Sequence, residues 1–120
     1  MAAVQQLSPA YPLGSRLSEA GVLEIAGCDA RALAREFGTP CYVVAEDDLR
    51  ARARAFTGAF GARTDHFAVL FATKAFPCTA VMRVLREEGL GCDVASGGEL
   101  HLALRAGFDP ARIVLHGNAK

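Results

Sequence analysis

The chain has 120 residues, of which 52% are apolar and 22% are charged, and its 13 basic and 13 acidic side chains cancel. This composition is typical of a globular domain of ordinary size, and the balanced charge argues against a nucleic-acid or anionic-membrane partner, since both require a basic face. No apolar run approaches the ~18 residues of a membrane span, and residues 1–20 lack the charged start and apolar core of a secretory signal. We therefore expect a cytoplasmic protein with no membrane partner, in which Cys28, Cys41, Cys78 and Cys92 are buried, reduced thiols.

The first third of the chain predicts short elements. Residues 1–20 are mixed and rich in proline and glycine, which indicates a loose lead-in, and residues 21–26 predict a strand. Asp29 can cap a short helix that ends at Gly38. A Thr-Pro pair then requires extended backbone, so we expect residues 41–45 to continue as a strand.

A longer helix follows, capped by Asp47 or Asp48. Its apolar residues recur at helical spacing, which predicts one buried face made of Leu49, Ala53, Phe56 and Phe60. Three arginines lie nearby, and a charge run of this kind usually indicates a solvated face: Arg50, Arg52 and Arg54.

From residue 47 onward, helices alternate with short apolar runs. The unbroken run at 67–72 is typical of a strand buried on both faces of a parallel sheet. The further elements we predict are a helix at 77–88, a strand at 91–95, a helix opened by a capping box of Ser96 and Glu99 and closed by Gly107, and a strand at 113–116. This order indicates an α/β fold with a parallel sheet or barrel. A complete (β/α)₈ barrel needs about 250 residues, so we expect the chain to be a truncated one.

Polar residues follow three of the predicted strands: Thr73 and Lys74, then Asp93 and Ser96, then His116 to Asn118. In parallel α/β folds the carboxyl ends of strands meet at one edge, where functional residues gather. The recurrence of polar residues at this edge predicts a site there.

Lys74 is the most informative of these residues. The chain contains eleven arginines and only two lysines, and arginine stays charged under all relevant conditions. A desolvated lysine can be neutral, and its amine then attacks carbonyl groups to form Schiff bases. The alternative is a lysine whose stem simply reaches from a strand end to water.

The other polar positions have ordinary explanations as well. Asp93 can be a solvated residue at a strand end, and a capping box accounts for Ser96 and Glu99 without any function. Gly97 and Gly98 leave a helix N-terminus open, which is a weak indication of an anion site. The three histidines are not at metal-ligand spacing, so we expect no metal site.

Several motifs follow one another in an order found in a known family. They are Gly38-Thr39-Pro40-Cys41-Tyr42-Val43-Val44, Phe71-Ala72-Thr73-Lys74-Ala75, Gly91-Cys92-Asp93-Val94-Ala95-Ser96-Gly97-Gly98-Glu99-Leu100, Ala106-Gly107-Phe108 and Gly117-Asn118-Ala119-Lys120. Residues 21–120 thereby resemble the N-terminal part of the diaminopimelate decarboxylases, a branch of the fold-type III pyridoxal-phosphate (PLP) decarboxylases. The family's usual Tyr-x-x-Lys-Ala-Asn is here changed at both ends, to Phe71 and Phe76.

The resemblance implies a (β/α)₈ barrel of the alanine racemase-like type and a second, β-rich domain. Residues 21–45 would belong to the β-rich domain, residues 46–120 to the first part of the barrel, and residues 1–20 to the lead-in. Lys74 matches the Schiff-base lysine that holds PLP, and Asp93 and Glu99 match acidic positions near the cofactor. The family's phosphate loop, the acidic partner of its pyridine nitrogen and its interface cysteine and tyrosine have no counterpart in these residues.

The implied reaction is decarboxylation of a small amino-acid substrate, meso-diaminopimelate, to L-lysine, by an enzyme that is a homodimer at full length. Two alternatives stay open: a decarboxylase of the ornithine or arginine type, and a homologue that has lost catalysis. We expect the 120 residues alone to be inactive, because the implied barrel and much of its cofactor site would be incomplete.

Overall fold

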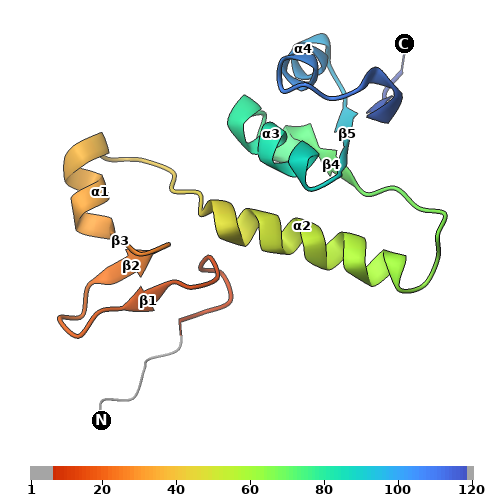
Figure 1. Ribbon diagram of the computed structural model, residues 1–120. Helices are drawn as coiled ribbons and strands as arrows, with labels where there is room; N and C mark the ends of the chain where they lie inside the picture. The colour runs from red at the N-terminus through yellow and green to blue at the C-terminus, as the bar shows by residue number, and fades with distance from the viewer. Residues whose placement is uncertain (1–6, 119–120) are drawn as a thin grey trace. The chain divides into compact units, whose positions relative to one another are not determined.

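The computed structural model describes residues 7–118, and the chain divides into two compact units, Met1–Leu49 and Arg50–Lys120. In the first unit, a three-stranded antiparallel sheet has the order β1-β2-β3, with β1 at Arg16–Leu17, β2 at Leu23–Ile25 and β3 at Cys28–Asp29 (Figure 1). The predicted strand at 21–26 is therefore confirmed as β2. The described part of the predicted lead-in is less loose than expected, because β1 pairs with β2 through Leu17 and Leu23.

The sequence analysis missed β1 and β3 because each is only two residues long. Ala26 and Gly27, which connect β2 to β3, have φ angles of 50° and 78°. Positive φ at both central residues is the geometry of the tight hairpin turn that matches strand twist. The turn therefore brings β3 back beside β2.

Helix α1 runs from Ala30 to Phe37, as predicted. Asp29 caps it by accepting hydrogen bonds from the backbone N–H groups of Arg31 and Ala32, and the hydrogen bonds of the cap lower the Asp29 pKa. Gly38 closes it with a φ of 81°.

The predicted strand at residues 41–45 is wrong, since this segment is irregular and extended. Tyr42 is 96% exposed, and Val43 and Val44 are also exposed. No described strand pairs with them, and β-branched and aromatic residues form a strand only where a neighbour supplies hydrogen bonds and packing.

Helix α2 spans Glu46–Gly61 and begins before the predicted caps. Asp47 and Asp48 lie in its first turn, where a negative charge complements the helix dipole. Asp48 also accepts a hydrogen bond from the backbone N–H of Leu13 at 3.0 Å.

The predicted apolar face of α2 is only partly buried. Ala53 is 3% exposed, but Phe56 and Phe60 are exposed. Phe60 stacks on Phe67 with ring centroids 5.9 Å apart, so these two rings shield each other in part. The prediction of a buried face therefore holds for Ala53 and is wrong for Phe56 and Phe60, because burial depends on tertiary neighbours that helical spacing does not specify.

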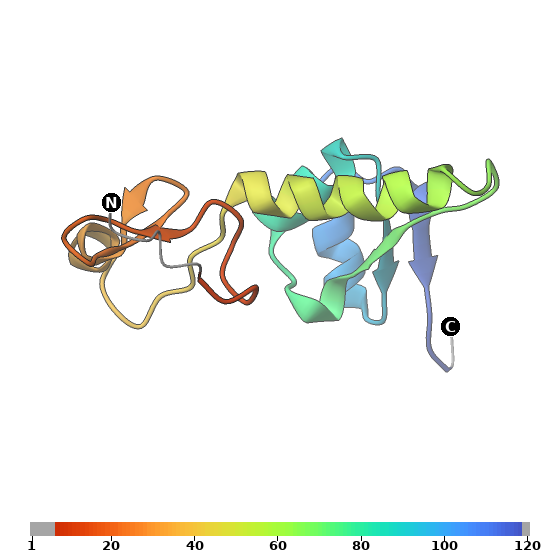
Figure 2. The same cartoon turned by 90° about the horizontal axis from the view of Figure 1, so that it is seen from below.

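The second unit contains a parallel sheet of order β4-β5-β6, formed by Leu70–Ala72, Gly91–Val94 and Ile113–Leu115 (Figures 1 and 2). Helix α3, Thr79–Glu87, connects β4 to β5. Helix α4, Gly97–Arg105, and the short 3₁₀ turn η2, Pro110–Arg112, connect β5 to β6. The predicted alternation and the α/β class are confirmed.

The core of this unit lies around β5 and the two helices. Its fully or nearly fully buried members are Met82 of α3, Cys92 and Val94 of β5, Ala103 and Ala106 of α4 and its end, and Phe108. Burial raises the pKa of the Cys92 thiol to about 11, so this thiol stays neutral and packs as an apolar group. The expectation of buried thiols holds for Cys92 but is wrong for Cys28 and Cys41, which are exposed.

Strand β4 is shorter and more open than predicted. It begins at Leu70 rather than Phe67, and both of these side chains are exposed, at 38% and 40%. Within the described residues, β4 pairs only with β5, so one edge of β4 has no strand beside it. An apolar run thus predicted the strand and its pairing mode, while its burial on both faces is not seen.

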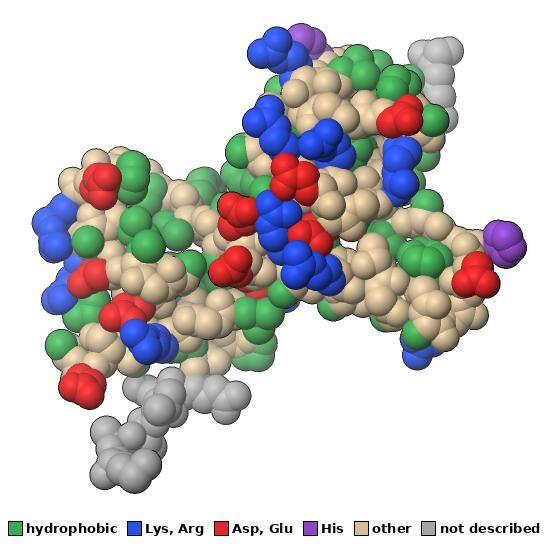
Figure 3. Space-filling view, viewed as in Figure 1, with side chains coloured by type: hydrophobic (Ala, Val, Ile, Leu, Met, Phe, Trp, Pro, Cys, Tyr) green, Lys and Arg blue, Asp and Glu red, His purple; other side chains and the backbone are tan. Residues whose placement is uncertain are grey.

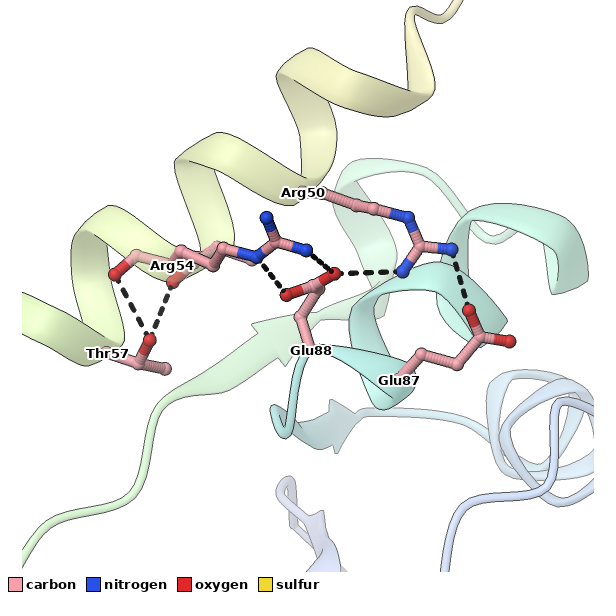
Figure 4. Close-up of polar contacts among 6 residues, drawn as sticks. Arg50, Arg54, Thr57, Glu87 and Glu88 are labelled. Carbon is pink, nitrogen blue, oxygen red and sulfur yellow. Dashed lines mark hydrogen bonds and ion pairs between the residues drawn. The ribbon is translucent and has the colours of Figure 1, made fainter.

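The prediction of a solvated face holds for Arg52 and Arg54, which are exposed, but is wrong for Arg50, whose side chain is only 22% exposed. Arg50 donates to Glu87 at 2.7 Å and to Glu88 at 2.9 Å, and Arg54 donates to both oxygens of Glu88 at 2.6 and 2.8 Å (Figure 4). Blue and red side chains accordingly interleave over α2 and α3 in the space-filling view (Figure 3). The carboxylate of Glu88 is only 10% exposed, and its hydrogen bonds from Arg54 and Arg50 lower its pKa to about 2.

Candidate active site

Strand register brings the three predicted polar positions to one edge of the parallel sheet. Ala72, the last residue of β4, lies beside Asp93 of β5, and Val94 lies beside Leu115 of β6. Lys74 follows β4 directly, in the 3₁₀ turn η1, Thr73–Ala75, and His116 follows β6. The carboxyl ends of all three strands therefore carry polar side chains, as the sequence predicted.

Thr73 is the buried centre of this edge. It is 0% exposed, and its hydroxyl lies 3.0 Å from the backbone oxygen of Asp93 and 2.7 Å from Oε2 of Glu99. One residue of η1 thus connects the end of β5 with the first turn of α4. A buried hydroxyl with both partners present fixes these elements relative to one another.

Ser96 and Glu99 form only half of the predicted capping box. The Ser96 hydroxyl accepts a hydrogen bond from the backbone N–H of Glu99 at 3.1 Å, as expected. The Glu99 carboxylate, however, accepts from the backbone N–H of Ala95 at 2.7 Å and from Thr73. These hydrogen bonds lower the Glu99 pKa, so Glu99 is a carboxylate that belongs both to the cap and to the sheet edge.

Asp93 and His116 form a close pair between neighbouring strand ends. Nδ1 of His116 lies 2.6 Å from Oδ1 of Asp93, and the two side chains are 47% and 25% exposed. Asp93 is therefore more than a solvated residue at a strand end. The short distance is typical of a charge-assisted hydrogen bond.

Lys74 differs from its neighbours, because it makes no hydrogen bond or ion pair with any residue in the range 7–118. Its side chain is exposed, whereas the sequence suggested an apolar setting. Of the flanking aromatic residues, Phe71 packs against the core and Phe76 is 40% exposed. An exposed amine that has no partner among the described residues is accessible to a carbonyl group of a ligand.

The sequence analysis named Thr73 and His116 as polar strand-end residues but selected neither as a site residue. The signal for both was their place directly after an apolar run, which they share with Lys74. Their partners could not be deduced, because Thr73 reaches Glu99 across 26 positions and His116 reaches Asp93 across 23. Of the last quoted motif, Gly117 to Lys120, the final two residues lie outside the described residues.

Within residues 7–118, no group of three or more histidine, cysteine and acidic side chains could hold a metal ion. None of the helices in that range is long and apolar enough to cross a membrane.

The geometry defines an α/β protein with an exposed lysine at the carboxyl edge of a parallel sheet, and comparison with known proteins gives the class. Residues 46–120 match the family model of the pyridoxal-binding domain of pyridoxal-dependent decarboxylases. The chain belongs to this family of PLP-binding proteins.

Relatives within the family share one name. The chain is 48% identical over 110 residues to the diaminopimelate decarboxylase of Mycobacterium tuberculosis, with 92% of this chain and 24% of the relative covered. It is 46% identical over 106 residues to the same enzyme of Bacillus subtilis, with 88% and 24% covered. The chain thus spans about a quarter of the length of these curated relatives.

Solved structures confirm the fold. A diaminopimelate decarboxylase from M. jannaschii superposes with a TM-score of 0.76 at 34% identity, covering 88% of this chain and 25% of that structure. A protein from Aquifex aeolicus gives a TM-score of 0.79 at 37% identity over the same shares. The predicted fold class, the first part of an alanine racemase-like barrel, is confirmed.

Proposed function

We propose that the protein carrying this chain is a PLP-dependent decarboxylase that converts meso-diaminopimelate to L-lysine and carbon dioxide. The observation that carries this proposal is the unpaired Lys74 at the carboxyl edge of the sheet, inside the matched pyridoxal-binding domain. The shared name of the relatives supports the substrate. A solved M. jannaschii relative in co-complex with L-lysine supports the product.

The residues of the edge fit the cofactor. The amine of Lys74 is exposed and unengaged among the described residues, so it can reach the aldehyde of PLP and hold the cofactor covalently. Glu99 is kept ionised by its hydrogen bonds, and Asp93 is held by His116. Bound PLP supplies the electron sink that makes loss of carbon dioxide feasible.

Within this proposal the chain's own residues bind and orient. Lys74 anchors the cofactor and must give up a proton to do so, because only the neutral amine attacks a carbonyl. The carboxylates of Asp93 and Glu99 would interact with positively charged groups of the bound cofactor. Thr73 holds the Glu99 carboxylate in place through a hydrogen bond from its buried hydroxyl.

We further propose that the working enzyme is a cytoplasmic homodimer, as in the family it resembles. Residues 1–20 would be its lead-in, residues 21–45 part of a β-rich domain and residues 46–120 the first part of the barrel. The matched range of the pyridoxal-binding domain, which also begins at residue 46, supports this division.

The test is to express the protein that carries this chain and measure carbon dioxide release from meso-diaminopimelate, ornithine and arginine. We expect release from meso-diaminopimelate only. Comparable turnover of ornithine or arginine would move the protein to the other branch of the family, and no turnover with PLP bound would favour a homologue without catalysis.

Cofactor attachment is tested separately. Borohydride reduction of the PLP-loaded protein, followed by peptide mapping, should place the cofactor on the peptide that contains Lys74. A label on another lysine would refute the assignment whatever the substrate is. Expressed alone, the 120 residues should release no carbon dioxide.

A further inference from the structure

The hydrogen bond between His116 and Asp93 joins two neighbouring strands at the proposed cofactor edge. The backbone N–H of His116 donates to the backbone oxygen of Val94 at 3.0 Å, so the backbone of the histidine is bound to β5. Its Nδ1 then lies 2.6 Å from Oδ1 of Asp93, also on β5. His116 is thereby held once through its backbone and once through its imidazole, and the imidazole contact fixes the orientation of the Asp93 carboxylate.

Each of the two carboxylates at this edge uses only one of its oxygens within the chain. Asp93 uses Oδ1 for His116, and Glu99 uses Oε2 for both Ala95 and Thr73. Within the described part of the chain, the second oxygen of each carboxylate has no hydrogen-bond partner. Both carboxylates are therefore fixed by one oxygen and available through the other.

The charges that meet at this edge come from four elements. Lys74 lies on η1, Asp93 and the neutral Cys92 on β5, Glu99 at the start of α4, and His116 after β6. His116 shares the charge of Asp93 through a hydrogen bond of 2.6 Å to Oδ1, and Oδ2 of Asp93 stays available at the edge.

We infer that His116 is a positioning residue of the proposed cofactor site: it holds Asp93 through Nδ1 and thereby fixes how the free Oδ2 of that carboxylate is presented to PLP attached at Lys74. The inference rests on the proposed function only in that its effect is measured at Lys74. Nothing in it requires His116 to touch cofactor or substrate.

The first experiment needs no cofactor. Nitrogen-15 NMR of the imidazole in the cofactor-free protein should show the neutral ring protonated at Nδ1, because Asp93 accepts from that atom. In Asp93→Ala this preference should be lost. A ring protonated at Nε2 in the wild-type protein would overturn the inference.

The second experiment measures the affinity for PLP by absorbance titration. His116→Phe should weaken PLP binding about tenfold, because the Asp93 carboxylate loses the hydrogen bond that holds it in place. His116→Asn should stay close to wild type, because its amide places a donor near the position of Nδ1. An unchanged PLP affinity in a folded His116→Phe variant would refute the inference.

A double mutant separates positioning from direct contact. If His116 acts only through Asp93, then adding His116→Phe to Asp93→Ala should weaken PLP binding no further. A second full loss of affinity in the double mutant would mean that His116 acts directly, against the inference. Should the wild-type protein take up no PLP on Lys74, the proposed function fails, and the NMR experiment still decides whether the pair forms.

Discussion

The two ends of strand β5 carry similar charged residues in different states. Before its amino end, Glu88 holds both Arg50 and Arg54 through hydrogen bonds of 2.6 to 2.9 Å. Beyond its carboxyl end, Lys74 has no ion pair with any described residue, although Asp93 and Glu99 lie at the same edge. One end is internally paired, and the other keeps its cation and half of its carboxylate oxygens unengaged.

This difference indicates that the two ends of the strand have different roles, one in stability and the other in binding. Charges that pair within the chain stabilise the contact between α2 and α3, and nothing remains for a ligand. Charges left unpaired contribute little to folding but are ready to bind. In barrels of this kind the amino ends of strands serve stability and the carboxyl ends carry catalysis. The following substitutions test that division.

The largest effect should come from Lys74→Arg in the protein that carries this chain. Arginine keeps the positive charge but cannot lose its proton to form the bond with PLP, so we expect no detectable cofactor attachment or carbon dioxide release. Lys74→Ala should be equally inactive, and a small added amine should restore part of its turnover. Turnover of Lys74→Arg within tenfold of wild type would place the cofactor on another residue.

Local patterns in the sequence were enough to predict the elements of the second unit and the sheet edge that carries Lys74. The order of elements, the parallel sheet and the edge at which polar residues gather all followed from apolar runs and their spacing, because strand and helix periods are local properties. The family motifs then selected Lys74, Asp93 and Glu99 from that edge.

Contacts between distant residues could not be read in the same way. The pairing of Arg50 and Arg54 with Glu87 and Glu88 links positions 34 to 38 apart, and a charge run by itself indicates only a solvated face. The predicted strand at 41–45 is wrong for the opposite reason: residues 41–44 are exposed, and strand propensity without a partner strand produces no strand.

The second largest effect should come from Gly91→Ala at the start of β5. A Cβ there would lie 2.4 Å from Cδ2 of Leu70 and 2.8 Å from the backbone oxygen of Arg112, so β4 or η2 would have to shift. We expect a loss of about 1–3 kcal/mol in the free energy of unfolding, measured by urea denaturation. Gly97→Ala is the matched control, because nothing lies within 4 Å of its added Cβ. Equal losses in both variants would contradict the packing argument.

A smaller effect is expected from Glu88→Gln at the paired end. The change removes the carboxylate shared by Arg50 and Arg54, so the melting temperature should fall by a few degrees while PLP uptake stays at the wild-type level. Glu87→Gln is the control: Glu87 is 41% exposed and partners Arg50 at 2.7 Å, and an exposed pair contributes little. A larger loss in Glu87→Gln than in Glu88→Gln would refute this ranking.

Acid should remove the same contribution from the wild-type protein. The Glu88 pKa is lowered from 4.5 to about 2 in the folded state, so the unfolded chain binds the proton first as the pH falls. The stabilisation is complete above pH 4.5 and is lost progressively as the pH approaches 2. The difference in unfolding free energy between wild type and Glu88→Gln should therefore shrink across this window, and a constant difference would argue against the ion pairs as its source.

The smallest effect should come from Thr73→Val, which changes the buried centre of the unpaired end. Valine fills the same space but loses the hydroxyl that joins the Asp93 backbone oxygen to Glu99, at a cost of about 1 kcal/mol. Thr57→Val is the control, because the Thr57 hydroxyl bonds only to backbone oxygens of its own helix, at 3.2 and 3.3 Å. Removal of the Thr73 hydrogen bond, which lowers the Glu99 pKa, should raise that pKa and leave the carboxylate less firmly positioned, and the loss of positioning should weaken PLP binding. A Thr73→Val variant with lower stability but wild-type affinity for PLP would show that Thr73 stabilises the fold without contributing to PLP binding. The residues that serve stability would then include one at the carboxyl end of the sheet, directly before Lys74.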